Sequence, residues 1–166
     1  MLKVEKLLDS NLGELRKISR EIWLSHYAQI LSREQIEYML NLMYGDGVVE
    51  NEINNLGISY DQVIKDHQMV GYLSYGLEVD NNIDYLKLHK CYLLPKLHGF
   101  GYGQMMLSHV LKTAQLINKP IILNVNKENK KGINSYTRFG FKIIRSEVKD
   151  IGNGFVMDDY IMVYEI

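Results

Sequence analysis

The chain has 166 residues, a formal net charge of −1 and 46% hydrophobic residues, which predict a single folded domain over residues 1–166 rather than a disordered chain. The balanced charge argues against a nucleic-acid-binding face or a polybasic membrane anchor, and the single Cys91 excludes an internal disulfide and a cysteine-based metal cluster. With no signal-peptide pattern and no apolar run of membrane-spanning length, the sequence predicts a cytoplasmic protein without a membrane, nucleic-acid or metal partner.

The chain begins with a predicted strand and a predicted helix. Residues 2–7 alternate weakly between apolar and polar side chains, as a half-buried strand does. Asn11 followed by Glu14 forms a capping pattern that predicts the start of a helix. The apolar side chains that follow recur three and four positions apart and give this helix one buried face: Leu15, Ile18, Ile22 and Trp23.

Two further helices are predicted before the central strands. Ser32 and Gln35 form a second capping pattern. This pattern opens a helix whose apolar residues again have helical spacing: Ile36, Met39, Leu40 and Met43. The turn Gly45-Asp46-Gly47 ends the helix, and residues 48–57 predict a short helix after it.

The rest of the chain alternates between predicted strands and helices. Strands are predicted over residues 60–65, 69–77, 83–94, 121–125, 141–148 and 159–165, and helices over residues 102–118 and 130–139. Gly152-Asn153-Gly154 forms a loop between the last two strands. The strand that ends near Leu94 and the strand 121–125 are expected to be parallel neighbours. This order predicts an α/β (α+β) fold, with a mixed and mostly antiparallel sheet of six to seven strands flanked by about four helices.

A glycine-rich turn, His98-Gly-Phe-Gly-Tyr-Gly-Gln104, separates the predicted strand 83–94 from the predicted helix 102–118. Such a turn directs unpaired backbone N–H groups and the positive end of the helix dipole at one point, where a phosphate or pyrophosphate is the natural ligand. Glycine is favoured there because a side chain would block the close approach of the ligand. The spacing differs from the dinucleotide fingerprint G-x-G-x-x-G, and Gln104 stands where a P-loop has lysine. An ordinary glycine-rich turn is the alternative interpretation.

A second motif begins at Asn129 and reads Asn129-x-x-Gly132-x-x-x-Tyr136-x-x-x-Gly140-Phe141. Together with His98-x-x-Gly101-x-Gly103, it resembles the GNAT superfamily of N-acetyltransferases. The acetyl-CoA loop of that superfamily reads Arg/Gln-x-x-Gly-x-Gly/Ala, and its later segment reads Asn-x-x-Ala-x-x-x-Tyr-x-x-x-Gly-Phe. The resemblance covers residues 58–166 and extends to the helical N-terminal third. It implies the GNAT fold, in which the two parallel strands splay apart to admit the pantetheine arm, and acetyl-CoA as the co-substrate.

The resemblance implies which residues hold acetyl-CoA. The turn would bind the pyrophosphate, chiefly through its backbone amides: His98, Gly99, Gly101, Tyr102, Gly103 and Gln104. The backbone of Leu93 and Leu94 would pair with pantetheine, and one of their amides would donate to the oxyanion, while their side chains belong to the core. Asn129 matches a position that hydrogen-bonds the cofactor, and Asn also suits a helix N-cap.

One residue of the turn departs from the family pattern. His98 replaces the usual Arg or Gln, so that any charge pairing of its side chain with a phosphate would depend on pH. A solvent-exposed turn residue is the alternative interpretation of His98. Gly132 replaces the more usual Ala, which weakens the helix but leaves room for CoA.

The resemblance also implies catalytic roles for Tyr136 and His89. Tyr136 matches the family tyrosine whose hydroxyl lies near the CoA sulfur, where a phenol can protonate the leaving thiolate. A packed aromatic beside Phe139 and Phe141 is the alternative. His89 falls where many relatives carry a glutamate base, and histidine has a suitable pKa for that role, although a structural histidine is the alternative. Rival contributors to the acceptor site stand near the C-terminus, where the alternative is a solvated turn: Asp158, Asp159 and Tyr160.

The function implied by the resemblance is an acetyl-CoA-dependent N-acetyltransferase that acts on a primary amine of a small molecule, a polyamine or a peptide. The segment from Trp23 to Met39 is loosely similar to relatives of the polyamine type. A non-catalytic acyl-CoA-binding module is the second hypothesis, because no glutamate base is evident. A nucleotide-binding α/β domain with an unrelated ligand is the third. A homodimer is compatible with the sequence, which specifies neither the acceptor nor the oligomeric state.

Overall fold

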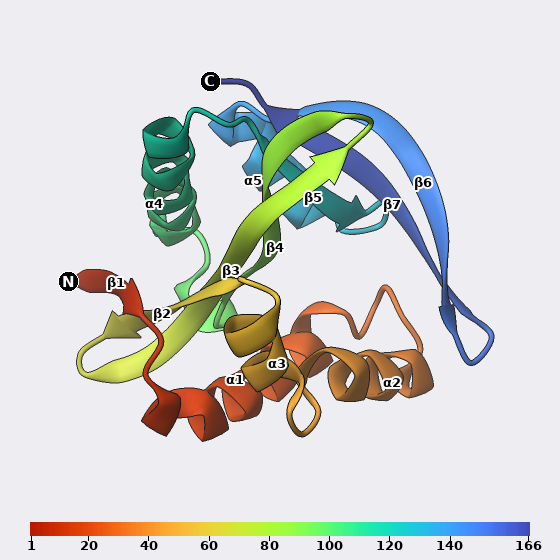
Figure 1. Cartoon of the computed structure of the whole chain (residues 1–166). Coiled ribbons are helices and arrows are strands. Elements are labelled where there is room, and N and C mark those ends of the chain that lie inside the picture. The colour runs from red at the N-terminus through yellow and green to blue at the C-terminus, as the bar shows by residue number, and fades with distance from the viewer.

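The computed structural model describes residues 1–166 and contains one seven-stranded sheet with the order β1-β2-β3-β4-β5-β7-β6 (Figure 1). The strands are β1 (Leu2–Lys6), β2 (Ser59–Lys65), β3 (Gln68–Asp80), β4 (Ile83–Leu93), β5 (Ile121–Asn126), β6 (Lys142–Gly152) and β7 (Phe155–Tyr164). The α-helices are α1 (Leu12–His26), α2 (Arg33–Tyr44), α3 (Val48–Asn55), α4 (Tyr102–Ile117) and α5 (Lys130–Phe139). Only β4 and β5 are parallel neighbours. The predicted α/β (α+β) class with a mostly antiparallel sheet is therefore confirmed.

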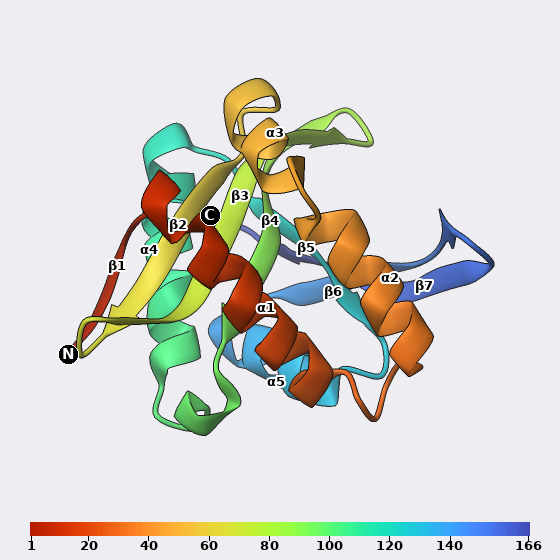
Figure 2. The ribbon, with the colours of Figure 1, turned by 90° about the horizontal axis from the view of Figure 1, so that it is seen from below.

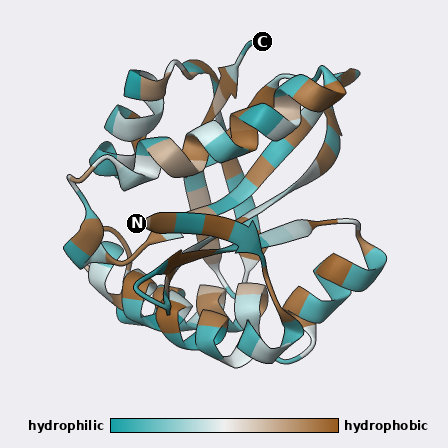
Figure 3. Cartoon of the chain, turned by 90° about the vertical axis from the view of Figure 1, so that its left-hand side faces the viewer, coloured by the Kyte–Doolittle hydropathy of each residue, from teal (hydrophilic) through white to brown (hydrophobic).

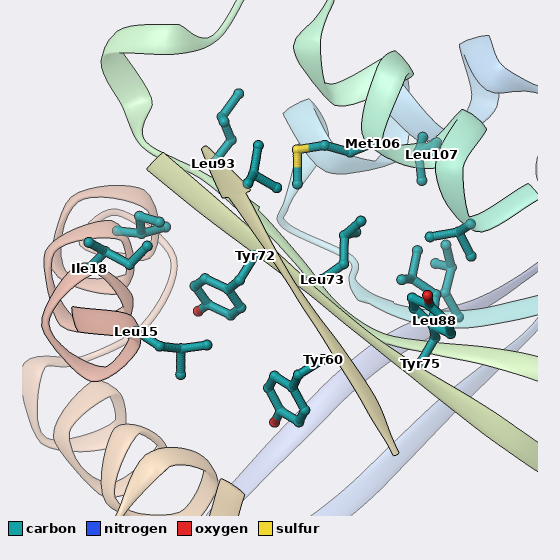
Figure 4. Packing of buried hydrophobic residues seen from close by; sticks show 14 of the residues in the cluster. Leu15, Ile18, Tyr60, Tyr72, Leu73, Tyr75, Leu88, Leu93, Met106 and Leu107 are labelled. Atoms are coloured by element: carbon teal, nitrogen blue, oxygen red, sulfur yellow. The ribbon is translucent and has the colours of Figure 1, made fainter. Parts of the chain in front are cut away.

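Helices cover both faces of the sheet. α1, α2 and α3 lie below it in Figure 1, and α4 and α5 lie on the opposite side, as the view from below also shows (Figure 2). Because side chains alternate along a strand, Tyr72 of β3 points towards α1 while Leu73 points towards α4, and both are fully buried (Figure 4). Brown and teal segments alternate along the helices in Figure 3, since each helix buries one side only. No helix combines the length and the apolar character needed to cross a bilayer.

The β6–β7 hairpin is longer than the sequence predicted. The predicted strands 141–148 and 159–165 extend to Gly152 and back from Phe155, through a two-residue turn in which Asn153 and Gly154 have φ of 54° and 78°. Most of β6 is exposed, so no alternation of buried and exposed residues marks its outer half in the sequence. The hairpin stretches away from the rest of the sheet towards α2 (Figure 1).

Side chains of α2 hold the outer part of this hairpin. The Tyr38 hydroxyl donates a hydrogen bond to the Ile151 carbonyl at 2.6 Å, and the Tyr38 ring lies 5.3 Å from that of Phe155. Gln35 Nε2 donates to the Val156 carbonyl at 3.0 Å. The hairpin and α2 therefore enclose the space between them.

Of the two predicted N-caps, the one at Ser32 is confirmed and the one at Asn11 is wrong. Ser32 caps α2 as predicted, because its hydroxyl accepts a hydrogen bond from the Gln35 amide at 3.1 Å. Asn11 precedes α1, but its side chain makes no capping bond and instead donates to Gln62 Oε1 of β2 at 2.7 Å. The Asn11 side chain bonds to Gln62, which is distant in sequence, instead of capping the helix. Local sequence patterns do not reveal such a partner.

Replacing the Ser32 cap is expected to destabilise the protein. Ser32→Ala leaves the Gln35 amide without its acceptor and should lower the free energy of unfolding by about 1 kcal/mol in urea denaturation. Ser25→Ala is the matched control, since Ser25 is exposed within α1 and alanine favours a helix. Equal stability of the two variants would contradict the capping role.

Candidate active site

The parallel strands β4 and β5 separate after a short paired segment. Their pairing runs from Leu86 opposite Ile121 to Leu88 opposite Leu123. Beyond these pairs β4 continues to Leu93 and β5 to Asn126 without pairing to each other. The gap between them belongs to a cavity of about 530 Å³ whose walls also include residues of α1, α2, α4, α5 and β7. The predicted parallel neighbours are thus confirmed.

A β-bulge in β4 lies where the strands separate. Ser74 pairs with Lys90 and Tyr75 pairs with Leu88, so that His89 is the extra residue of β4. The backbone directions show the effect: the Leu86 amide donates to Pro120, on the β5 side, whereas the Leu94 amide donates to Val70, on the β3 side. In a regular strand, amides an even number of residues apart point to the same side. Leu86 and Leu94 are an even number apart but point to opposite sides, because the extra residue at the bulge reverses the side to which each later amide points.

This reversal decides which amide of β4 is free. The Leu94 N–H is taken by the Val70 carbonyl at 2.8 Å, which corrects the expectation that Leu94 is an available donor. The Leu93 N–H points in the opposite direction, into the gap, and Leu93 itself lines the cavity while Leu94 does not. Both side chains are buried, as expected. Leu93 is therefore the candidate donor to an oxyanion.

The glycine-rich turn exposes a continuous row of amides. No backbone N–H from Gly99 to Gln104 donates to any other residue, and the first amide with a partner is that of Met105, which donates to Gly101. Gly99 and Gly101 have φ of +85° and +80°, a conformation that favours glycine. A Cβ atom at Gly103 would meet only Ser135 Oγ, at 3.9 Å. Such a row of unpaired donors at the start of α4 can hold a phosphate or pyrophosphate without any cationic side chain.

Two side chains of this turn are already engaged with the protein. His98 Nε2 lies 3.0 Å from the Leu93 carbonyl oxygen, to which it must donate because a carbonyl only accepts. Gln104 Nε2 donates to the backbone oxygen of Ser135 at 3.1 Å and so links α4 to α5. The expected anion contact of Gln104 therefore reduces to its backbone amide. The expected contact of His98 is corrected, because its backbone amide donates to the Pro95 carbonyl at 3.1 Å and is not free for a ligand.

Asn129 occupies the N-cap position of α5, which confirms the capping interpretation. Its Oδ1 accepts the Gly132 amide at 3.0 Å and lies 3.1 Å from His26 Nε2 of α1. Burial lowers the pKa of His26 below its usual value of 6.5, which favours a neutral ring that donates through Nε2. A Cβ atom at Gly132 would lie 2.6 Å from Asn129 Nδ2, so the space that glycine leaves is filled by Asn129 and not kept open for a ligand.

Cationic side chains stand near the same end of the cavity. Lys131 and Arg138 of α5 line the cavity together with the glycine turn and are exposed to solvent. Sequence patterns did not single them out, because surface lysines and arginines are common and only the fold brings α5 beside α4. This end of the cavity suits a polyanionic ligand.

Tyr136 of α5 lines the cavity. Its ring lies 5.7 Å from that of Phe141, edge to face, and its hydroxyl has no hydrogen-bond partner within the protein. Burial raises the pKa of Tyr136 well above its usual value of 10, so the phenol keeps its proton near neutral pH. Burial also raises the pKa of Cys91 to about 12, in agreement with an unreactive thiol. Tyr136 can therefore donate a proton into the cavity.

The far end of the cavity combines polar groups with apolar walls. His89 lies at the bulge of β4, where part of its surface remains in contact with solvent but the surrounding protein displaces much of its water, and this partial loss of solvation lowers its pKa below 6.5. Asp159 of β7 is buried there, although Asp158 beside it is exposed. Three methionines form the apolar walls, two on α2 and one on β7: Met39, Met43 and Met157. His89, the predicted base, and Asp159, a predicted rival at the acceptor site, both line the cavity.

Comparisons with known sequences agree with this geometry. A model of the acetyltransferase (GNAT) family matches residues 14–141. An uncharacterized N-acetyltransferase of Mycobacterium tuberculosis is 32% identical over 102 residues, which cover 61% of this chain and 63% of that protein. The chain thus spans less than two thirds of the length of this relative. Peptidyl-lysine N-acetyltransferase YjaB of Escherichia coli is 36% identical over 59 residues, or 35% of this chain and 37% of that protein.

Solved structures share the whole fold. PaiA N-acetyltransferase from Thermoplasma acidophilum, in complex with coenzyme A, has a TM-score of 0.81 at 25% identity, and the match covers 100% of this chain and 99% of that chain. NAA60 of Arabidopsis thaliana, in complex with a bisubstrate analogue, has a TM-score of 0.72 at 16% identity over 100% and 99% of the two chains. The second likeness concerns the fold alone.

Proposed function

Because the chain belongs to the GNAT family of acetyltransferases, we propose that it transfers the acetyl group of acetyl-CoA to a primary amine. The observation that carries the proposal is the row of unpaired amides from Gly99 to Gln104, which opens onto a cavity that continues between β4 and β5. A pyrophosphate at the amides and a thioester arm between the strands would occupy both parts at once. Coenzyme A in the similar structure of PaiA supports this class of ligand.

The residues of the cavity can supply what amide formation needs. Bound acetyl-CoA would provide the thioester carbon, to which a C–N bond forms while the C–S bond breaks. The Leu93 N–H points into the gap and would donate to the carbonyl oxygen as negative charge develops on it. His89 would take the proton that the amine loses, and the Tyr136 hydroxyl would give its proton to the departing sulfur. After this step His89 would carry one extra proton and Tyr136 would lack one. Solvent would take the proton from His89, and water in the cavity would return one to Tyr136.

The acceptor is proposed to be a small molecule, a polyamine or a peptide that carries a primary amine. The acceptor would occupy the part of the cavity beside α2 and β7, because residues of the glycine turn and α5 line the part that suits CoA. YjaB is named a peptidyl-lysine acetyltransferase, so a lysine-containing peptide belongs among the acceptors to be tried.

Two measurements test the function. Coenzyme A should raise the melting temperature, since a ligand at a hundred times its dissociation constant adds about 2.7 kcal/mol to the stability, whereas ATP and NAD should not. Release of thiol from acetyl-CoA should then depend on an added amine. Stabilisation by CoA without turnover of any amine would favour a non-catalytic acyl-CoA-binding module. Stabilisation by ATP or NAD but not by CoA would refute the proposal.

Replacing His89 is expected to change the pH dependence as well as the rate. The lowered pKa of His89 means that wild-type kcat/KM should fall on the acid side with an apparent pKa below 6.5. His89→Ala should lower kcat/KM about 100-fold and remove this acid limb. The measurement is the pH–rate profile of both proteins with one amine.

Added imidazole provides the control for His89→Ala. Because His89 is exposed, free imidazole can reach its place and should restore part of the lost rate. An unchanged pH profile and rate in the variant would show that another group is the base.

A further inference from the structure

Asp159 is a buried carboxylate with one oxygen that has no partner. Its side chain lines the cavity and only 8% of the residue is exposed, yet its Oδ1 atom has no hydrogen-bond partner. Asp159 lies on β7 opposite Asn126 of β5, and Met157 on the same face of β7 lies 3.8 Å from Gln35 Nε2 of α2. A buried charge that the fold leaves unpaired costs free energy, so it requires an explanation other than stability.

The charged groups around Asp159 do not neutralise it. Lys127 pairs with Asp158 at 2.7 Å, and Lys87 donates to Asn124 Oδ1 at 2.6 Å. The other neighbour, Glu147 of β6, is itself negative. Burial raises the pKa of Asp159 above its usual value of 3.8, and the charges of Glu147 and Asp158 raise it further, against the opposing effects of Asn124 and Lys87. A positive charge brought into the cavity would therefore gain a ready partner.

We propose that Asp159 binds a cationic nitrogen of the acceptor and thereby selects amines that carry a second positive charge. The inference rests on the proposed function. The bound nitrogen is not the one that reacts, because a carboxylate favours the charged form of the nitrogen it contacts, while the attacking amine must be neutral. Asp159 is thus a specificity-determining residue, and His89 remains the proton acceptor.

The rest of the cavity fits such an acceptor. Lys131 and Arg138 of α5 line the cavity as cations that suit the phosphates of CoA, and Asp159 lines it from β7 as an anion that suits a cationic acceptor. Met39, Met43 and Met157 provide apolar walls for an aliphatic chain between the two nitrogens. The outer hairpin that is bound to α2 through Tyr38 keeps this part of the cavity enclosed.

A matched pair of acceptors tests the proposal. 1,4-Diaminobutane and n-butylamine share a four-carbon chain and differ by the second ammonium group. Wild-type protein should show a kcat/KM for the diamine at least about 10-fold above that for the monoamine, mainly through KM, because a desolvated ion pair typically contributes more than 1.4 kcal/mol. Asp159→Asn should reduce this ratio to about 2, the statistical advantage of two equivalent ends.

Asp158→Asn is the control, because Asp158 is the adjacent carboxylate but is exposed and paired with Lys127. It should keep the wild-type preference for the diamine. Asp159→Asn should also keep or raise the melting temperature, since it removes an unpaired buried charge, and a fall of more than about 4 °C would indicate a structural role and overturn the proposal.

The outcomes separate the two proposals. A wild-type protein that acetylates both amines equally, or an Asp159→Asn variant that keeps the preference, would refute the role of Asp159 and leave the acetyltransferase function intact. Failure of the wild-type protein to use any amine would refute the function itself and with it the role of Asp159.

Discussion

Gly101→Val is expected to weaken the binding of coenzyme A by about 100-fold or more. Gly101 has φ of +80°, where a β-branched residue is strained, so valine would turn the backbone away and misdirect the amides around it. Each hydrogen bond to a charged group contributes about 1.5–3 kcal/mol, and the loss of two accounts for the expected effect. Isothermal titration with CoA measures it directly.

Gly47→Val is a closely matched control for this variant. Gly47 also has φ of +80°, also precedes a helix as its N-cap, and also has no atom within 4 Å of an added Cβ. The two substitutions should therefore impose similar backbone strain and similar losses of melting temperature. Gly47 does not line the cavity, so Gly47→Val should bind CoA normally. Equal CoA affinity of the two variants would show that the glycine turn is not the phosphate site.

Tyr136→Phe is expected to lower kcat about 100-fold while the affinity for CoA stays within about threefold. The expected loss lies at the lower end of the usual range for a general acid, because a thiol with a pKa near 8.5 is already a fair leaving group. Phenylalanine keeps the ring that packs against Phe141 at 5.7 Å and removes only the hydroxyl, which bonds to no other residue. Steady-state kinetics with CoA titration separate the two effects.

Tyr164→Phe is the control for this experiment. The Tyr164 ring lies 5.6 Å from the same Phe141, but Tyr164 does not line the cavity, so its loss of a hydroxyl should leave kcat unchanged. Because burial holds the pKa of Tyr136 well above 10, its hydroxyl stays protonated near neutral pH, and deprotonation of Tyr136 should not lower wild-type kcat there. A Tyr136→Phe variant with wild-type kcat would instead support the non-catalytic module or a purely positioning role.

The order of the elements was predictable because its signals are local. Helical spacing of apolar residues predicted α1, α2 and α4, and the Ser32 cap was confirmed. The outer part of the β6–β7 hairpin was missed, because most of β6 is exposed and its outer half shows no hydrophobic alternation. Asn11 was assigned a capping role that a partner on β2 prevents.

The candidate site was predictable as a set of residues but not as an arrangement. Sequence motifs named the turn, Tyr136 and His89, because family patterns record residue types at fixed spacing. They did not reveal that Leu94 donates to Val70, since this depends on a one-residue bulge at His89. The motifs also did not predict the charges near Asp159, because Glu147 and Lys87 belong to other strands that only the fold brings close to it.

The amino-acid sequence by itself determined the order of the strands and helices, the glycine turn with its left-handed residues, and the family to which the chain belongs. These properties depend on backbone preferences and on spacing within a few residues. Only the tertiary structure decided which amides remain unpaired, which side of β4 faces the cavity and which carboxylate oxygen is buried without a partner. Hydrogen-bond pairing and loss of solvent depend on groups that are distant along the chain, so the fold must bring them together before either can be known.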